Sequence, residues 1–283
     1  MIPSIRPPRP LMLVYRAYVT LFFIYLALPL AVVAVFAFND SQFPSLPWKG
    51  FTLQWFFGAE HPMLGVFHER PILRALGNSG FIALIVSLLC VVVGTTNAFL
   101  FNRYDFRLKG LFYVLMLLPL VIPGIVLGIS ILVFSSTVAN GVWESMNYEI
   151  EALRPGLTLV ILGQFSFITT IVTLVIAARL QKFDRTLEEA ALNLGANRLT
   201  AVRTVTIPFL APALIGGFVV AFLMSFENFN TTLMLVGSDA PLTIAMFDRL
   251  KEGSTPLLNA VSLLLILGST VLALAMVTFQ RKR

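Results

Sequence analysis

The chain has 283 residues, of which 58% are apolar and only 12% charged, and its formal net charge is +6. A soluble domain carries about 25% charged residues, so the composition excludes an ordinary soluble protein and predicts a polytopic all-α membrane protein. One cysteine and two histidines leave too few ligands for a disulfide framework, and we expect no metal site.

The first apolar run, residues 17–38, is long enough to cross a bilayer core of about 30 Å. A cleaved signal peptide is the alternative, because Val35–Phe38 offers a passable cleavage site. The run is longer than the roughly 7–15 apolar residues of a signal peptide, which favours an uncleaved helix. In the external loop that follows, Trp48 and Trp55 are typical of residues at the membrane–water interface.

Five further apolar runs complete a prediction of six transmembrane helices. In the third, Pro119 and Pro123 with Gly124 and Gly128 predict a kinked and closely packed span. The runs after the first cover residues 80–101, 111–134, 157–178, 207–226 and 257–279.

Polar side chains lie in the fourth span and at the outer end of the fifth. Such groups are costly within a membrane and predict a route for a solute, although Ser and Thr also serve helix packing. A carboxylate beside an aromatic ring suits an amine, whereas a solvated helix end or a structural contact with a partner permease is the alternative for Glu227. The predicted substrate path is Glu227, Asn228, Gln164, Phe226 and Thr169.

The loop between the fourth and fifth spans, residues 184–206, is unusually polar. Thr186 and Glu189 have the spacing of a capping box at the start of a helix over about 187–194. Gly195 fits the position just after that helix, and a second helix can run from about Asn197 to Thr206. Glu189 is thus expected to cap the helix first and to contact a partner second.

One apolar stripe runs along this short helix. Its residues recur at positions 0, 3, 4 and 7, and something must cover them: the chain's own transmembrane helices, lipid or another protein. The stripe consists of Leu187, Ala190, Ala191 and Leu194.

The distribution of positive charge predicts the orientation. Fourteen of the 20 basic residues fall on the side that holds residues 184–206, so the positive-inside rule places this loop and both termini in the cytoplasm. These residues are Arg6, Arg9, Arg16, Arg103, Arg107, Lys109, Arg179, Lys182, Arg185, Arg198, Arg203, Arg281, Lys282 and Arg283.

A family resemblance rests on the same loop. Glu189-Ala190-Ala191, three residues, Gly195, nine residues and then Val205-Thr206-Ile207-Pro208 resemble the EAA…G…I-x-L-P loop of permease subunits of binding-protein-dependent ABC importers. This sequence departs from that pattern at Val205 and Ile207. The resemblance implies a type I importer fold whose coupling helices dock on a cytoplasmic ATPase. The residues it implies for ATPase coupling are Glu189, Ala190, Ala191, Leu194, Gly195 and Ala196.

The resemblance also implies an organisation and partners. We expect one transmembrane permease domain over 1–283, with the first helix and external loop in 1–74, the family core in 75–279 and the coupling loop in 184–206. The expected partners are an ATPase dimer that holds ATP and Mg²⁺, a second and different permease, an extracytoplasmic solute-binding protein and membrane lipid, but no nucleic acid. The expected location is the bacterial inner membrane.

Two further stretches resemble spermidine/putrescine-type permeases, namely LPLVIPGIVLGISIL at 118–132 and PLTIAMFDRLKEGSTPLLNAVSLLLIL at 241–267. They imply a small cationic or zwitterionic solute.

An ion-gradient secondary transporter is the main alternative, although no carboxylate falls in the middle of a predicted span. A membrane enzyme would need a clustered catalytic set, and a passive scaffold would leave the polar loop unexplained. The chain lacks a G-x-x-x-x-G-K-[ST] phosphate loop, so ATP hydrolysis is expected on another subunit.

Overall fold

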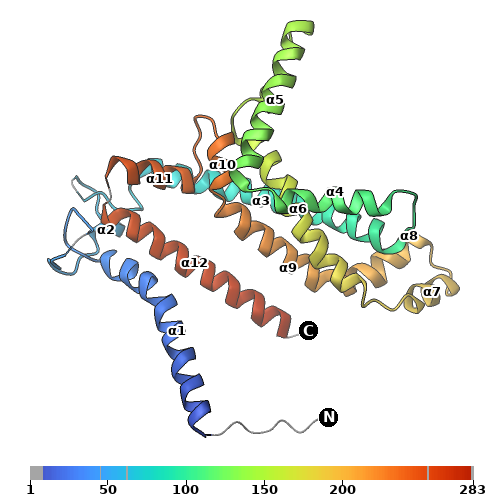
Figure 1. Ribbon diagram of the computed structural model, residues 1–283, viewed down its shortest axis with the longest axis horizontal. Helices are drawn as coiled ribbons and strands as arrows, with labels where there is room; N and C mark the ends of the chain where they lie inside the picture. Colours follow the sequence, from blue (N-terminus) through green and yellow to red (C-terminus); the bar gives the residue numbers. More distant parts are fainter. Residues whose placement is uncertain (1–8, 45, 62, 254, 282–283) are drawn as a thin grey trace. The chain divides into compact units, whose positions relative to one another are not determined.

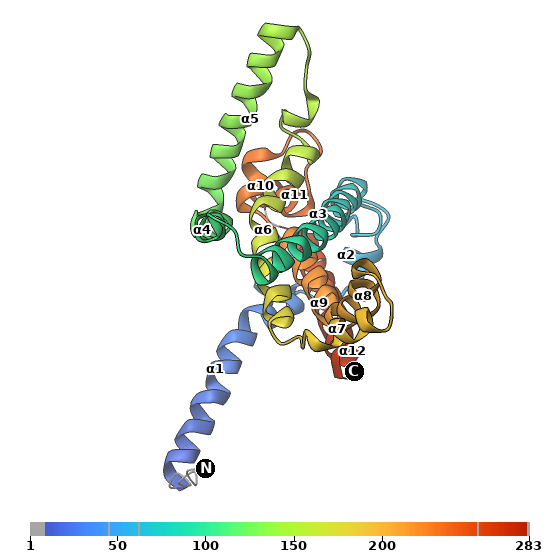
Figure 2. The ribbon, with the colours of Figure 1, turned by 90° about the vertical axis from the view of Figure 1, so that its right-hand side faces the viewer.

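The structure, a computed structural model, describes residues 9–44, 46–61, 63–253 and 255–281. Helices joined by loops make up the described chain (Figures 1 and 2), together with one isolated bridge between Asn39 and Phe51. Of the basic residues that predict the orientation, Arg6, Lys282 and Arg283 lie outside the described residues. The elements are α1 (Arg9–Phe36), α2 (Gln54–Phe57), α3 (Arg70–Arg103), α4 (Lys109–Val121), α5 (Gly124–Met146), the 3₁₀ turn η1 (Glu151–Leu153), α6 (Leu157–Leu180), α7 (Thr186–Asn193), α8 (Arg198–Ala201), the π turn η2 (Val202–Thr206), α9 (Ile207–Phe226), α10 (Asn230–Leu235), α11 (Leu242–Glu252) and α12 (Pro256–Arg281).

Within the described residues, six helices are long and apolar enough to cross a membrane, which confirms the predicted number. All six overlap the predicted spans, although the third does so only in part. The second is longer than expected, because α3 begins at Arg70 and not near residue 80.

The third predicted span is wrong as a single helix over 111–134. The chain is helical to Val121, is extended at Ile122 with a ψ of 129°, and starts a new helix at Gly124. Pro123 explains the break, because its ring disfavours helical geometry at the preceding residue and it lacks a backbone N–H. The segment that can cross the membrane is α5, since α4 has only 13 residues.

The described chain divides into two units, and the first comprises Met1–Arg70 and Arg249–Thr270. Its helix α1 is exposed along nearly its whole length. The loop after α1 is ordered by Trp55, which is 3% exposed and whose indole N–H donates to the carbonyl of Asn39 at 2.9 Å. Of the two tryptophans predicted at the membrane–water interface, Trp55 therefore has its ring buried in the loop, whereas Trp48 is exposed. An ion pair between Glu69 and Arg249 also lies in this unit.

The second unit, Pro71–Asp248 with Val271–Arg283, is built around α6. Ile168, Val172 and Ile176 of this helix are fully buried, and α9 packs along it. Lipid tails are as apolar as these side chains, so helix association in a membrane depends on close packing and hydrogen bonds rather than on the hydrophobic effect.

Two glycines show how close that packing is. A Cβ at Gly128 of α5 would lie 2.9 Å from the Cβ of Met234 in α10, and one at Gly163 of α6 would lie 2.3 Å from Leu235 Cδ1. A larger residue at Gly128 would press on the backbone of α10, and one at Gly163 would displace the Leu235 side chain. The close packing predicted for the Gly124–Gly128 segment is therefore confirmed, and it fixes the short helix that follows α9.

Candidate functional site

The polar segment between α6 and α9 begins with α7, within one residue of the predicted helix. The predicted capping box does not form, because the N-cap position is Arg185 and the amide of Glu189 donates to the carbonyl of Arg185. Asp184 caps the first turn instead: its Oδ1 accepts the N–H of Thr186 at 3.0 Å, and this bond lowers the pKa of the Asp184 carboxyl. Glu189 is exposed, and the prediction that it caps the helix is wrong.

Gly195 ends α7 in the predicted left-handed conformation, with a φ of +93°. The N–H of Ala196 donates to the carbonyl of Ala191 at 3.1 Å, and the N–H of Gly195 donates to that of Leu192 at 3.0 Å. These two bonds form a Schellman motif, which satisfies carbonyls at the helix end that would otherwise lack a partner. The turn is therefore defined by backbone geometry that glycine adopts easily.

The second helix of the segment starts as predicted but does not stop. The side chain of Asn197 accepts the N–H of Thr200 at 2.8 Å, and the helix then continues through the π turn into α9. In the π turn the N–H of Ile207 donates to the carbonyl of Val202. Pro208 has no N–H to offer the preceding turn, which favours such a local widening. Any movement of this elbow (α7, Gly195 and α8) can therefore pass into α9 through a continuous helix.

The apolar stripe on α7 is not covered by the described part of the chain. Leu187 is 51% exposed and Leu194 is 90% exposed, while Ala190 is exposed and Ala191 half-buried. Of the three coverings considered for the stripe, the described helices of the second unit, to which α7 belongs, therefore do not supply one. Leu187 and Leu194 thus form an exposed apolar surface on α7, which lipid or another protein can cover.

Glu188, the neighbour of Glu189, turns towards the chain. Its two carboxylate oxygens accept hydrogen bonds from Arg103 at the end of α3 and from Thr206 in the π turn. Burial alone would raise the pKa of Glu188, but these two hydrogen bonds and the positive charges of Arg103 and Arg185 bring the pKa below its usual value. Its carboxylate is therefore ionised at neutral pH.

A second polar group lies where α9 ends. The side-chain amide of Gln164, on α6, donates to Thr232 Oγ1 at 2.8 Å and accepts a hydrogen bond from Ser225. Thr232 in turn donates to Asn228 Oδ1 at 2.9 Å. This polar cluster (Gln164, Ser225, Asn228 and Thr232) joins α6, the end of α9 and α10. Because non-helical backbone within a membrane must be satisfied by protein or water, the cluster explains how the chain can leave α9 at Glu227.

The predicted substrate-path residues fall into two environments. Gln164 and Thr169 are buried, and the Thr169 hydroxyl donates to the carbonyl of Phe165 at 2.6 Å. Glu227 is exposed at the C-cap of α9, and Phe226 beside it is half-buried, with its ring stacked 5.9 Å from that of Phe222. The structure thus brings Gln164 and Asn228 into one cluster, next to Phe226 and Glu227 in the chain, and leaves Thr169 separate from them.

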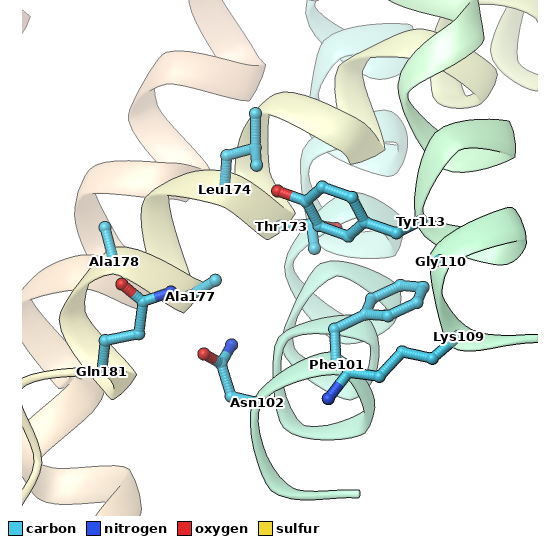
Figure 3. Close-up of a pocket in the computed structure, with 10 residues that line it drawn as sticks. All are labelled: Phe101, Asn102, Lys109, Gly110, Tyr113, Thr173, Leu174, Ala177, Ala178 and Gln181. Atoms are coloured by element: carbon cyan, nitrogen blue, oxygen red, sulfur yellow. The ribbon is translucent and has the colours of Figure 1, made fainter. Parts of the chain in front are cut away.

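A cavity of about 570 Å³ lies between α3, α4 and α6 (Figure 3). The rings of Phe101 and Tyr113 line one side, and the amides of Asn102 and Gln181 line another. Its one charged lining residue, Lys109, is paired with Asp105 at 2.8 Å. The Lys109 hydrogen bond and charge lower the pKa of that carboxyl. With a lysine and no carboxylate in its lining, this cavity does not suit a cation.

The sequence interpretation missed two contributions. It considered Arg103 and Glu188 only for their charges, and it did not consider Thr232. Asn228 precedes α10 and accepts from both the N–H and the hydroxyl of Thr232, and an asparagine shortly before a helix was a signal for the latter contact. For Arg103 and Glu188, 85 positions apart, no local signal exists.

Comparison with known proteins agrees with this geometry. The family model described as "Binding-protein-dependent transport system inner membrane component" matches residues 91–282. The "Putrescine transport system permease protein PotI" of Escherichia coli K12 is 28% identical over 247 residues, covering 86% of this chain and 82% of that protein. The "Spermidine/putrescine transport system permease protein PotC" of Haemophilus influenzae is 27% identical over 267 residues, covering 94% of each chain.

Two further similarities bear on the substrate and on the fold of this chain. The "Sulfate transport system permease protein CysT" of Salmonella typhimurium is 29% identical over 206 residues, 71% of this chain and 73% of that protein. A solved bacterial ABC transporter involved in the import of the acidic polysaccharide alginate matches the fold with a TM-score of 0.75 at 16% identity, over 96% of this chain and 95% of that chain. Relatives of similar identity are thus named for solutes of opposite charge. Their names therefore do not decide the charge of this chain's solute, which must be argued from particular residues.

Proposed function

Because this chain belongs to the family of binding-protein-dependent transport system inner membrane components, we propose that it carries a small cationic or zwitterionic, polyamine-like solute across the membrane. It is a permease subunit of an ABC importer and a multi-pass inner-membrane protein. Its role is transport, and it is not an enzyme.

The observation that carries the proposed mechanism is the uncovered apolar stripe on α7. Leu194, 90% exposed, stands out from a segment that is ordered by its own capping bonds. An ordered apolar projection on a polar surface suits a protein groove. We take that groove to belong to a cytoplasmic ATPase dimer, which binds ATP and Mg²⁺, with Glu189, Ala190, Ala191, Leu194, Gly195 and Ala196 as the coupling residues.

The rest of the assembly follows from this placement. The positive charges around the elbow support a cytoplasmic position for it and for both termini. A second, different permease would complete the channel, and an extracytoplasmic binding protein would deliver the solute. ATP binding then closes the ATPase dimer, α7 moves with it, and the solute cavity opens alternately to the two faces.

The charge of the solute is argued from Glu227. This carboxylate is exposed where α9 ends, beside the stacked rings of Phe226 and Phe222, and ring faces and carboxylates both attract ammonium groups. The same proposed path includes the polar residues Gln164, Asn228 and Thr169. Of these, Gln164 and Thr169 are buried, and we assign them the task of holding the helices of the path in place. The names of the putrescine and spermidine relatives support this choice.

Purification of the chain from its own membranes tests the assembly. We expect an ATPase and a second permease to co-purify, and we expect the complex to hydrolyse ATP faster when liganded binding protein is added. The competing function is ion-gradient-driven transport, which predicts uptake into vesicles that lack ATP and its loss with an ionophore. Uptake of that kind, with no associated ATPase, would contradict the proposal.

Glu227→Gln tests the solute. The change keeps the shape of the side chain and removes its charge, so we expect the KM for a diamine to rise about fivefold, as suits one exposed charge pair, with little change in kcat. Glu252→Gln, which removes an exposed carboxylate from the end of α11, is the matched control and should leave KM unchanged. An unaltered KM in Glu227→Gln would show that this carboxylate does not meet a cationic solute.

A further inference from the structure

Glu188 holds α7 to two other parts of the chain through one carboxylate. Oε2 accepts from the guanidinium of Arg103, the last residue of α3, and Oε1 accepts from the hydroxyl of Thr206, the last residue of the π turn before α9. All three side chains belong to the second unit. One ionised group therefore joins the ends of three helical segments, of which α3 lies 85 positions from Glu188 along the chain.

Arg103 is fixed in place by its surroundings. Its guanidinium carbon lies 5.0 Å from the ring centroid of Phe99 and 5.6 Å from that of Phe183, which suits cation–π attraction. The side chains of Arg103 and Glu188 are only 15% and 14% exposed. Water screens such a pair less than it screens an ordinary surface ion pair, so the pair is more than a transient contact.

Besides the two rings, the guanidinium is held by its ion pair with Glu188. Arg103 Nη2 is buried and has no hydrogen-bond partner within the described chain, so the charge is balanced through Nη1 and Glu188. Loss of the Glu188 charge would leave a mostly buried cation without its counter-ion, which is far more costly than loss of an exposed pair. The arginine is therefore expected to change position when Glu188 is neutralised.

The remainder of α7 has few connections to the membrane helices. No residue of α7 is buried, and its stripe faces outwards. A second bond runs beside the first, from Arg185 Nη2 to the carbonyl of Asn102 in the last turn of α3 at 3.0 Å. Force applied to the outer face of α7 can therefore reach α3 through this small group of bonds, whereas α9 is reached both through Thr206 and through the continuous helix from α8.

We propose that Glu188, Arg103 and Thr206 form a strut that makes α7, the inner end of α3 and the start of α9 move as one body during transport. The proposal rests on the proposed function of α7 as the ATPase-coupling helix. It assigns different tasks to two adjacent carboxylates: Glu189 faces the partner, and Glu188 transfers the movement inwards. The three strut residues are positioning residues, since none of them needs to touch ATP or the solute.

The coupling ratio tests the strut in the reconstituted complex with its ATPase, second permease and binding protein. In Glu188→Gln and in Arg103→Gln, we expect ATP hydrolysis to continue while the solute imported per ATP hydrolysed falls at least about fivefold. Arg103→Lys keeps the charge and should restore part of the ratio. Arg107→Gln removes an exposed cation four residues along the chain and is the matched control, expected to import as the unchanged complex does.

A distance measurement tests the same strut without the ATPase. Cys90 is the only cysteine, so a Cys90→Ala chain accepts spin labels at Leu100→Cys on α3 and Leu192→Cys on α7. In the full chain in lipid nanodiscs, we expect a narrow distance distribution that broadens in Glu188→Gln and stays narrow in Arg107→Gln. Melting temperatures of the variants show whether each one is folded.

The outcomes separate the two proposals. A Glu188→Gln complex with an unchanged coupling ratio, or labels whose distances do not broaden, would overturn the strut. An unchanged complex whose ATPase does not respond to binding protein would overturn the proposed function, while the labels would still decide whether Glu188 holds α7 to α3. A loss of coupling as large in Arg107→Gln as in Glu188→Gln would also overturn the strut, since general loss of charge would then explain the effect.

Discussion

Replacement of Gly195 by leucine is expected to reduce ATP-driven uptake about tenfold or more while the chain still inserts in the membrane. The φ of +93° at this position costs a residue with a Cβ about 1–2 kcal/mol, and the two Schellman bonds from Gly195 and Ala196 would be strained or lost. The elbow would then present Leu194 at a different angle to the ATPase. Uptake and binding-protein-stimulated ATP hydrolysis, measured together, check this expectation.

Asparagine at the same position is the informative control. A Cβ at Gly195 would have no neighbour within 4 Å, so the expected damage comes from backbone conformation and not from a clash. Asparagine tolerates the left-handed region better than other non-glycine residues, and Gly195→Asn should keep most of the activity. If leucine supports full stimulated ATP hydrolysis, or if asparagine is as damaging as leucine, the turn geometry of Gly195 is not what coupling requires.

Gln164→Leu is expected to loosen the junction between α9 and α10 and to abolish most uptake. Leucine has nearly the same size, but it leaves Ser225 without its acceptor and Thr232 without its donor in a site where Gln164 is 1% exposed. Each buried polar group that loses its hydrogen-bond partner lowers the free energy of unfolding by about 1–3 kcal/mol. Hydrogen exchange of the amides in residues 225–235 and the melting temperature in detergent measure the loss directly.

The matched control for Gln164→Leu is Gln181→Leu, because Gln181 is exposed just beyond the end of the same helix. It should change neither exchange nor melting. Unaltered protection of residues 225–235 in Gln164→Leu would mean that packing of Gly128 and Gly163 against α10 holds this junction without the polar cluster. A fall in uptake with unaltered protection would instead place Gln164 on the solute route itself.

Prediction from sequence was most successful where the cause is local. Apolar runs of sufficient length fix the number of membrane helices, because each run can satisfy its own backbone hydrogen bonds within lipid. The turn at Gly195 and the cap at Asn197 are likewise set by the residues beside them. The third span failed because a proline within an apolar run can kink a helix or end it, and hydropathy does not distinguish these results.

What the sequence alone determined, then, is a membrane protein with six spanning helices, a polar elbow that turns at Gly195 and a motif that resembles importer permeases. Tertiary structure alone decided which side chains meet. Glu188 and Glu189 are equivalent in composition and charge, yet about 100° of helical rotation points one towards Arg103 and leaves the other exposed. Gln164 and Ser225, 61 positions apart, likewise meet only because α6 and α9 pack together. Such pairings depend on helix phase and packing distance, and these are properties of the folded chain.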